Sequence, residues 1–130
     1  MNKTSLEKLS TCHPDLIKLA HAVNEVYPIQ VICGERNEAD QNDAFKRGAS
    51  KKKFPESKHN INKEKGRYNS HALDAVPDPD KNPKTLEWKD LEAFALMCEV
   101  FAQKADELGI KIRQGKDFRF RDFPHQELVS

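Results

Sequence analysis

EWKDLEAFALMCEVFAQKADELGIKIR, residues 87–113, places a long amphipathic helix directly before a short strand. Apolar side chains recur at helical spacing through residues 87–108, a pattern typical of a helix that is buried in a core. This stripe consists of Leu91, Phe94, Ala95, Cys98, Phe101, Ala102, Ala105 and Leu108. Gly109 suits the end of the helix because glycine readily adopts the left-handed conformation, and residues 110–113 alternate as a strand does. A core helix that leads into a strand predicts an α+β domain.

The residues on either side of this stretch predict further helices and strands. Regular apolar spacing predicts a helix over residues 12–27, and β-branched alternation predicts a strand over residues 29–33. A second helix is expected over residues 37–46, where an asparagine can cap its first turn. Its expected inner face carries Gln41, Ala44 and Phe45. Short strands at residues 72–76 and within residues 122–129 complete a small α+β domain, in which a short antiparallel sheet packs with helices.

Length, composition and charge narrow the classes of function. With 130 residues, the chain fits one domain, so we expect residues 1–130 to act as a unit. The 22 Lys and Arg residues are balanced by 21 Asp and Glu residues, which argues against nucleic-acid binding. No apolar run reaches the roughly 18 residues of a membrane span, and residues 1–10 lack the apolar core of a secretory signal. We therefore expect synthesis in the cytoplasm and no membrane insertion.

The three cysteines argue against a disulfide framework. The chain has an odd number of cysteines, which lie far apart in the sequence at Cys12, Cys33 and Cys98, and it has no C-x-x-C pair. They are interpreted as small buried hydrophobic residues. The histidines therefore carry most of any metal or acid–base chemistry.

Four residues offer the components of a hydrolytic zinc site. Such a site needs three nitrogen or oxygen ligands, an open position for water and a nearby carboxylate. His59, Asp74 and His125 are candidate ligands, and Asp122 lies three residues before His125. Each also has a plain interpretation: a surface histidine, a turn-forming aspartate and a surface ion pair. Asp74 is the hardest to explain in that way, because a carboxylate that faces inward from an apolar strand needs a partner.

Several motifs, taken in chain order, resemble one enzyme family. They are VICGER (31–36), DQ (40–41), FxxG (45–48), SKHN (57–60), SxAxDAxP (70–77), the helix to residue 108, RxGxD (113–117) and DxPHxEL (122–128). Together they cover about three quarters of the chain. The series resembles the zinc peptidases of peptidoglycan, which include D-Ala-D-Ala carboxypeptidases, D-Ala-D-Ala dipeptidases and phage L-alanyl-D-glutamate endopeptidases. The phage endolysin branch is the most similar.

The resemblance implies a role for each residue of the site. His59, Asp74 and His125 would bind one Zn²⁺, and Asp122 would be the general base. Two imidazoles and one carboxylate leave the ion a net positive charge with which to acidify a water. Arg36 would bind the substrate carbonyl or the developing oxyanion; its alternative is an ion pair with Glu35 or Glu38. Ser57 and Glu127 would lie behind the metal ligands and help to orient them.

The sequence departs from the family pattern in three ways. The spacing between His59 and Asp74 is longer than is usual, and residues 61–68 resemble an insertion. His71 is a competing ligand, but alternation along a strand would direct residues 71 and 74 to opposite faces, so His59 is preferred. Phe118 stands where the family often has tryptophan, a change expected to affect packing more than chemistry.

The resemblance predicts the reaction and its setting. We expect cleavage of the L-Ala–D-Glu bond of the peptidoglycan stem peptide by addition of water. The alternatives are a D-Ala-D-Ala carboxypeptidase and a non-catalytic cell-wall binding module. The lack of an export signal favours an endolysin that is stored in the host cytoplasm, is released by a holin and acts on the wall as a monomer.

The basic segment over residues 46–67 has three interpretations. It carries nine Lys and Arg residues against Glu56 and Glu64. A solvated surface loop is the leading one, and attraction of anionic wall polymers or muropeptides is the second. Nucleic-acid contact comes last, because only Phe54 and Tyr68 could stack on bases.

Overall fold

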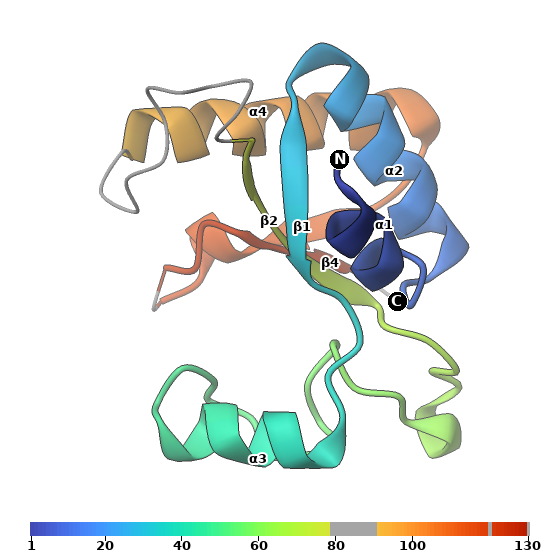
Figure 1. The fold of residues 1–130 in the computed structure, drawn as a ribbon, viewed down its shortest axis with the longest axis vertical. Coiled ribbons are helices and arrows are strands. Elements are labelled where there is room, and N and C mark those ends of the chain that lie inside the picture. Colours follow the sequence, from blue (N-terminus) through green and yellow to red (C-terminus); the bar gives the residue numbers. More distant parts are fainter. Residues whose placement is uncertain (79–90, 120, 130) are drawn as a thin grey trace.

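The computed structural model describes residues 1–78, 91–119 and 121–129, and it shows a small α+β domain (Figure 1). Four antiparallel strands form one sheet in the order β1-β2-β4-β3. Their bounds are β1 Ile29–Cys33, β2 Ala72–Pro77, β3 Ile112–Gln114 and β4 His125–Leu128. The predicted fold class, with helices packed on a short antiparallel sheet, is confirmed.

Within the residues that the structure describes, four helices and two short 3₁₀ turns accompany the sheet. They are α1 Lys3–Leu9, α2 Pro14–Val26, α3 Glu38–Lys46, α4 Leu91–Leu108, η1 Lys63–Lys65 and η2 Gly115–Asp117. Helices α2 and α3 lie where regular spacing and the asparagine cap predicted them, and α4 ends before Gly109, which has a φ of 70°. The predicted start of α4, before Leu91, falls outside the described residues. In the described chain, no helix is both long and apolar enough to cross a membrane.

Three features of the helices differ from expectation. In α4, Leu91, Ala95 and Ala102 of the predicted apolar stripe are exposed, whereas Ala93, Met97 and Val100 are buried. Helix α1 was not predicted, because its seven residues bury only Ser5 and Leu9 and so show no apolar stripe. In α3, Gln41 and Ala44 are buried as predicted, but the placement of Phe45 on the inner face is wrong. Its ring is partly exposed and lies under the ammonium group of Lys53, with the nitrogen 5.2 Å from the ring centre.

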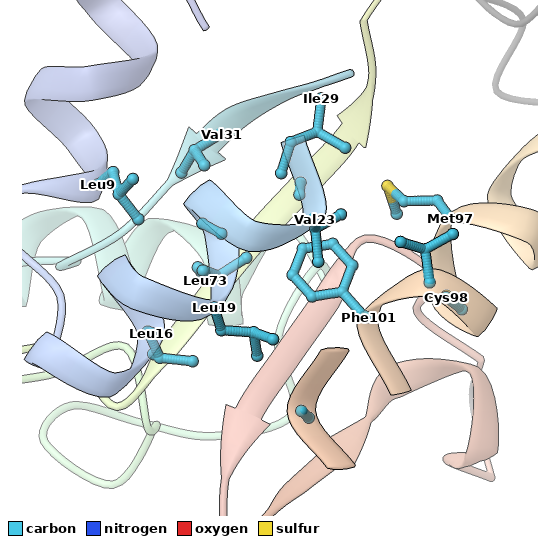
Figure 2. Close-up of a cluster of buried hydrophobic side chains, with 14 of the residues drawn as sticks. Leu9, Leu16, Leu19, Val23, Ile29, Val31, Leu73, Met97, Cys98 and Phe101 are labelled. Atoms are coloured by element: carbon cyan, nitrogen blue, oxygen red, sulfur yellow. The ribbon is translucent and has the colours of Figure 1, made fainter. Parts of the chain in front are cut away.

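The hydrophobic core fills the space between α2, α4 and the sheet. Figure 2 shows side chains of α2 meeting those of α4 over the central strand β2. Leu19 and Val23 of α2 and Phe101 of α4 are fully buried, as is Leu73 of β2. The placement of Cys12 and Cys98 in the core is confirmed. Because the core holds β2 from one side, the position of its residues is defined within the fold.

Strand β2 brings the candidate ligands together through its register. Asp74 is paired with His125 on β4 and with Cys33 on β1, next to an irregularity in the β1 pairing. Directly opposed residues on antiparallel strands have their side chains about 5 Å apart. The register therefore places Asp74 and His125 side by side in the sheet.

The basic segment before β2 is partly interior, unlike a purely solvated loop. Ser57, His59 and Asn60 are buried, and so is the side chain of Arg67. The Arg67 guanidinium donates hydrogen bonds to the backbone carbonyls of Pro55, Ser57 and Asn60 at 3.1–3.4 Å. Carbonyl acceptors offset the cost of burying a cation. This contact anchors the segment that carries His59.

Candidate metal centre

Three side chains that are distant in sequence converge on one point beside the sheet. The Asp74 Oδ1 atom lies 3.2 Å from His59 Nε2 and 3.2 Å from His125 Nδ1. The two imidazole nitrogens are themselves 3.3 Å apart. All three residues are shielded from solvent, and His59 is only 2% exposed. The structure therefore brings together the three residues that the resemblance proposed as ligands.

The loop that carries His59 is held by its own backbone and side chains. The His59 backbone N–H donates to the Ser57 hydroxyl at 3.2 Å, and the Ser57 N–H donates to the Asn60 side chain at 3.0 Å. The His59 carbonyl accepts from the Arg36 N–H at 2.9 Å, which ties the loop to the end of β1. Ser57 thus lies beside the candidate ligand and supports its backbone, and among the described residues it forms no hydrogen bond with the imidazole ring.

Each imidazole has a hydrogen-bond acceptor on the side away from Asp74. His59 Nδ1 lies 2.7 Å from the Gly34 carbonyl oxygen, and His125 Nε2 lies 2.9 Å from the Glu127 carboxylate. If each of these nitrogens carries the proton and donates, the other ring nitrogen has a lone pair that faces Asp74. Acceptors that hold the distant N–H of a ligand histidine are typical of metal sites.

The charges within the cluster shift the pKa values in opposite directions. Burial alone would lower the pKa of His59, but the adjacent Asp74 carboxylate outweighs it and raises the pKa to about 10. Burial would raise the pKa of Asp74, and the two histidines instead hold it well below its ordinary range. The pKa of His125 is raised by Asp74 and Glu127 against its burial, and that of Glu127 is lowered by His125.

The donor set fits a divalent cation. Two imidazole lone pairs and a carboxylate oxygen within 3.3 Å of each other repel unless a proton or a cation lies among them. Nitrogen and carboxylate ligands in this combination are used by zinc and by other first-row metals. The described residues form two candidate ligand groups, Cys33–His59–Asp74 and Asp74–Asp122–His125. The site is therefore a possible metal centre.

Asp122 lies at the edge of the cluster on a turn that precedes β4. Its carboxylate is within 4.8 Å of ligand atoms of Asp74 and His125, and the residue is exposed. Partial desolvation and the negative charge of Asp74 raise the pKa of Asp122. The turn is held by hydrogen bonds from the Asp122 N–H to the Gly115 carbonyl and from the His125 N–H to the Asp122 carbonyl, at 2.9 and 3.1 Å.

Arg36 follows β1 and reaches the same cluster. Its Nη2 lies 3.7 Å from Asp74 Oδ2, and its Nη1 donates to the side-chain oxygen of Gln41 at 3.0 Å. The alternative ion pair with Glu35 or Glu38 is not formed among the described residues. Sequence reasoning placed Gln41 on the inner face of α3 but missed its contact with Arg36. The signal was an uncharged polar residue at a position expected to be buried.

The other residues near the centre are placed as follows. His71, the competing ligand, lies edge-on against the ring of His13 at 5.1 Å and belongs to neither candidate ligand group of the described chain. Cys33 was interpreted as a core residue, but it is only half-buried, and its Sγ lies 3.8 Å from His59 Nδ1. The Phe118 ring packs against the ring of His125, with the ring centres 5.4 Å apart.

The cluster lies in a cleft of about 410 Å³. Its walls come from the segment after α3, the SKH motif, the turn before β4 and β4 itself. The side chains and glycine that line it are Arg36, Gly48, Ala49, Ser50, Lys51, Lys52, Ser57, Lys58, His59, Phe118, Arg121, Asp122, His125 and Glu127. A cleft of this size accommodates a short peptide around the candidate ligands.

Comparison with known proteins identifies the family. The model of the phage L-alanyl-D-glutamate peptidase family matches residues 1–129. The chain belongs to this family. It is therefore an L-alanyl-D-glutamate peptidase, a peptidoglycan hydrolase of the phage endolysin type, as the motifs predicted. The family's name agrees with the endopeptidase activity that was preferred over a D-Ala-D-Ala carboxypeptidase.

One relative agrees with this assignment in sequence, and one solved structure has a similar fold. The chain is 32% identical over 129 residues to the L-alanyl-D-glutamate peptidase of Escherichia phage T5, with 97% of this chain and 86% of the phage protein covered. Its fold is similar to that of Serratia marcescens L-Ala D-Glu endopeptidase ChiX, with a TM-score of 0.78 at 24% identity. That alignment covers 99% of this chain and 89% of ChiX.

Gly115 provides a test of the turn that holds Asp122 and His125. A Cβ atom at this position would collide with the Asp122 carbonyl oxygen and lie 2.9 Å from His125 Cβ. We expect Gly115→Ala to destabilise the fold by roughly 1–3 kcal/mol and, if the cluster is a metal centre, to lower its affinity for Zn²⁺ as the probe ion, because the turn must move. Denaturant unfolding and competition with a chelator measure the two effects.

Gly109→Ala is the matched control for Gly115→Ala. Gly109 follows α4, away from the cluster, and has a φ of 70° with open space around it, so alanine there strains the backbone by about 1 kcal/mol without touching the site. Its Zn²⁺ affinity should equal that of the wild type. Wild-type Zn²⁺ affinity in Gly115→Ala would contradict the proposed need for close packing at the turn.

Proposed function

We propose that the chain is a zinc-dependent endopeptidase that cleaves the L-Ala–D-Glu bond of peptidoglycan stem peptides, with His59, Asp74 and His125 as the zinc ligands. The observation that supports it most is the pair of acceptors behind the imidazoles. The Gly34 carbonyl and the Glu127 carboxylate would each accept the proton of one ring nitrogen. Once a metal displaces the proton held beside Asp74, the other nitrogen of each ring would direct its lone pair toward Asp74 Oδ1. A pre-oriented set of two nitrogens and one oxygen, open to a cleft, is the arrangement of a catalytic zinc site.

The chemistry that a bound zinc supplies is Lewis acidity, which polarises a peptide carbonyl and acidifies a water. Asp122 is the general base in this proposal: its carboxylate takes a proton from the attacking water and then gives it to the leaving amine of the glutamyl residue. The new C–O bond forms first, which places negative charge on the carbonyl oxygen, and the C–N bond then breaks as the amine is protonated, so one water is consumed for each bond cleaved. The raised pKa of Asp122 suits a group that both accepts and donates a proton.

Arg36 is proposed to stabilise the negative charge that develops on the carbonyl oxygen. Its guanidinium lines the cleft beside Asp74 and is oriented by the buried amide of Gln41. The same amide oxygen accepts from Asn60 at 3.2 Å, which links Arg36 to the loop that carries His59. A cation fixed before the reaction stabilises the transition state without a cost of reorganisation.

The biological setting follows from the same proposal. Residues 1–130 would act as one catalytic domain, made in the host cytoplasm and released to the wall through a holin-type lesion. Its substrate would be the stem peptide, and the chain would work as a monomer.

Asp122→Asn tests the general base. The amide cannot accept the proton, so we expect kcat on purified muropeptides to fall by roughly 10²- to 10⁴-fold, while Zn²⁺ affinity and thermal stability stay near wild type. Mass spectrometry of the digest gives both the rate and the bond. Asp106→Asn, an exposed carboxylate on α4, is the control and should keep full activity. Full activity of Asp122→Asn would exclude it as the base, and release of D-Ala alone would indicate the carboxypeptidase instead.

The proton content of the metal-free site makes zinc binding depend on pH. His59 has a pKa of about 10 in the metal-free protein, so near neutral pH it holds a proton that zinc must displace. Affinity should therefore rise with pH between about 6 and 8, by up to about tenfold per pH unit for each displaced proton. Chelator competition at several pH values, with correction for chelator protonation, measures the slope. A slope of zero would contradict the proposed ligands.

A further inference from the structure

The cleft has a marked positive charge although the chain is nearly neutral. Its lining includes five Lys and Arg side chains against the carboxylates of Asp122 and Glu127, whereas the whole chain has a net charge of +1. The cations are Arg36, Lys51, Lys52, Lys58 and Arg121. Like charges gathered in one cleft repel each other, and they attract anionic ligands from solution.

Two of these cations contact other residues of the fold, so their presence in the cleft has a structural reason. Arg36 contacts Asp74 and Gln41, and the Lys58 ammonium donates to the Leu128 carbonyl at 3.0 Å. Lys52 and Arg121 differ from them. Both are exposed, and within residues 1–78, 91–119 and 121–129 neither side chain forms a hydrogen bond or ion pair. Their charges contribute little to the fold and remain available to a ligand.

The position of Arg121 indicates which side of the scissile bond the positive charge of the cleft would face. Arg121 directly precedes Asp122, and both residues line the cleft. In the proposed reaction Asp122 protonates the leaving amine, so the residue that bears this amine must lie next to Asp122. That residue is the glutamyl residue. It has two carboxyl groups, and since only one can join the next residue, the other is free to carry a negative charge.

We propose that Lys52 and Arg121 bind the free carboxylate of the glutamyl residue and make the enzyme selective for acidic stem peptides over amidated ones. This inference rests on the proposed function and names the substrate class of the same site. Arg121 approaches from the turn before β4, and Lys52 approaches from the segment after α3. The backbone of Lys52 is held in place because its carbonyl oxygen accepts a hydrogen bond from the side-chain amide of Gln41 at 2.6 Å. A carboxylate between them would receive charge-assisted hydrogen bonds from two walls of the cleft.

Two muropeptides that differ in one group test the proposal. One carries the free carboxylate on its glutamyl residue, and the other carries a carboxamide at the same place. Wild-type protein loaded with Zn²⁺ should cleave the acidic muropeptide with a kcat/KM about tenfold higher, mainly through a lower KM. In the double variant Lys52→Gln/Arg121→Gln the ratio should fall close to one. Added salt should reduce the wild-type preference, since both side chains are exposed.

Lys63→Gln/Lys65→Gln is the matched control. These two lysines belong to the same basic segment, and they lie on η1 outside the lining of the cleft. The control has the same net charge as the test variant and should keep the wild-type preference. Thermal melting and Zn²⁺ affinity confirm that both variants fold.

The outcomes separate the inference from the function on which it rests. Equal cleavage of the two muropeptides by the wild type, or an unchanged preference in the test variant, would overturn the assignment of Lys52 and Arg121 and leave the endopeptidase intact. An equal loss of preference in the control would also overturn it, because general attraction would then be the cause. Cleavage of neither muropeptide by zinc-loaded protein would overturn the proposed function and this inference with it.

Discussion

The carboxylate of Asp74 is the constraint on which the rest of the structure depends. It lies on β2, one of the two inner strands of the sheet, flanked by the buried residues Leu73 and Ala75. A carboxylate in such a place is costly unless cations or hydrogen-bond donors surround it. His59, His125 and Arg36 meet that need from three different segments of the chain. The residues of the site are therefore those that stabilise the negative charge of Asp74.

The fold delivers those partners with little freedom. The core of α2 and α4 holds β2 in place, antiparallel register places His125 opposite Asp74, and the Gly34 carbonyl and Glu127 carboxylate set the two rings. Apolar packing therefore determines where the polar site lies. The open side of the cluster is the cleft, where Asp122 and the exposed cations meet solvent. A rigid inner half and an accessible outer half suit a catalyst that must bind a polymer.

Much of this could be predicted from the sequence, for physical reasons. The long apolar stripe of residues 91–108 and the short apolar run around Asp74 are strong local signals, and the ordered motifs predicted the family. What could not be predicted depends on contacts distant in sequence. The hydrogen bond at the Gly34 carbonyl cannot be predicted, because every residue type has a backbone carbonyl. The contact of Arg36 with Gln41 depends on the tertiary fold. Helix α1 buries too few residues to show an apolar pattern. The burial of Arg67 was hidden by a composition that is typical of solvated loops.

The most direct test of this account is the position of the metal in crystals of the zinc-loaded protein, located by anomalous scattering at the zinc absorption edge. The account predicts one zinc per chain, with His59 Nε2, Asp74 Oδ1 and His125 Nδ1 at coordination distances of about 2.0–2.2 Å. Gly34 and Glu127 should keep their hydrogen bonds to the distant ring nitrogens. Zinc bound instead through Cys33, or bound with His125 turned away, would contradict it.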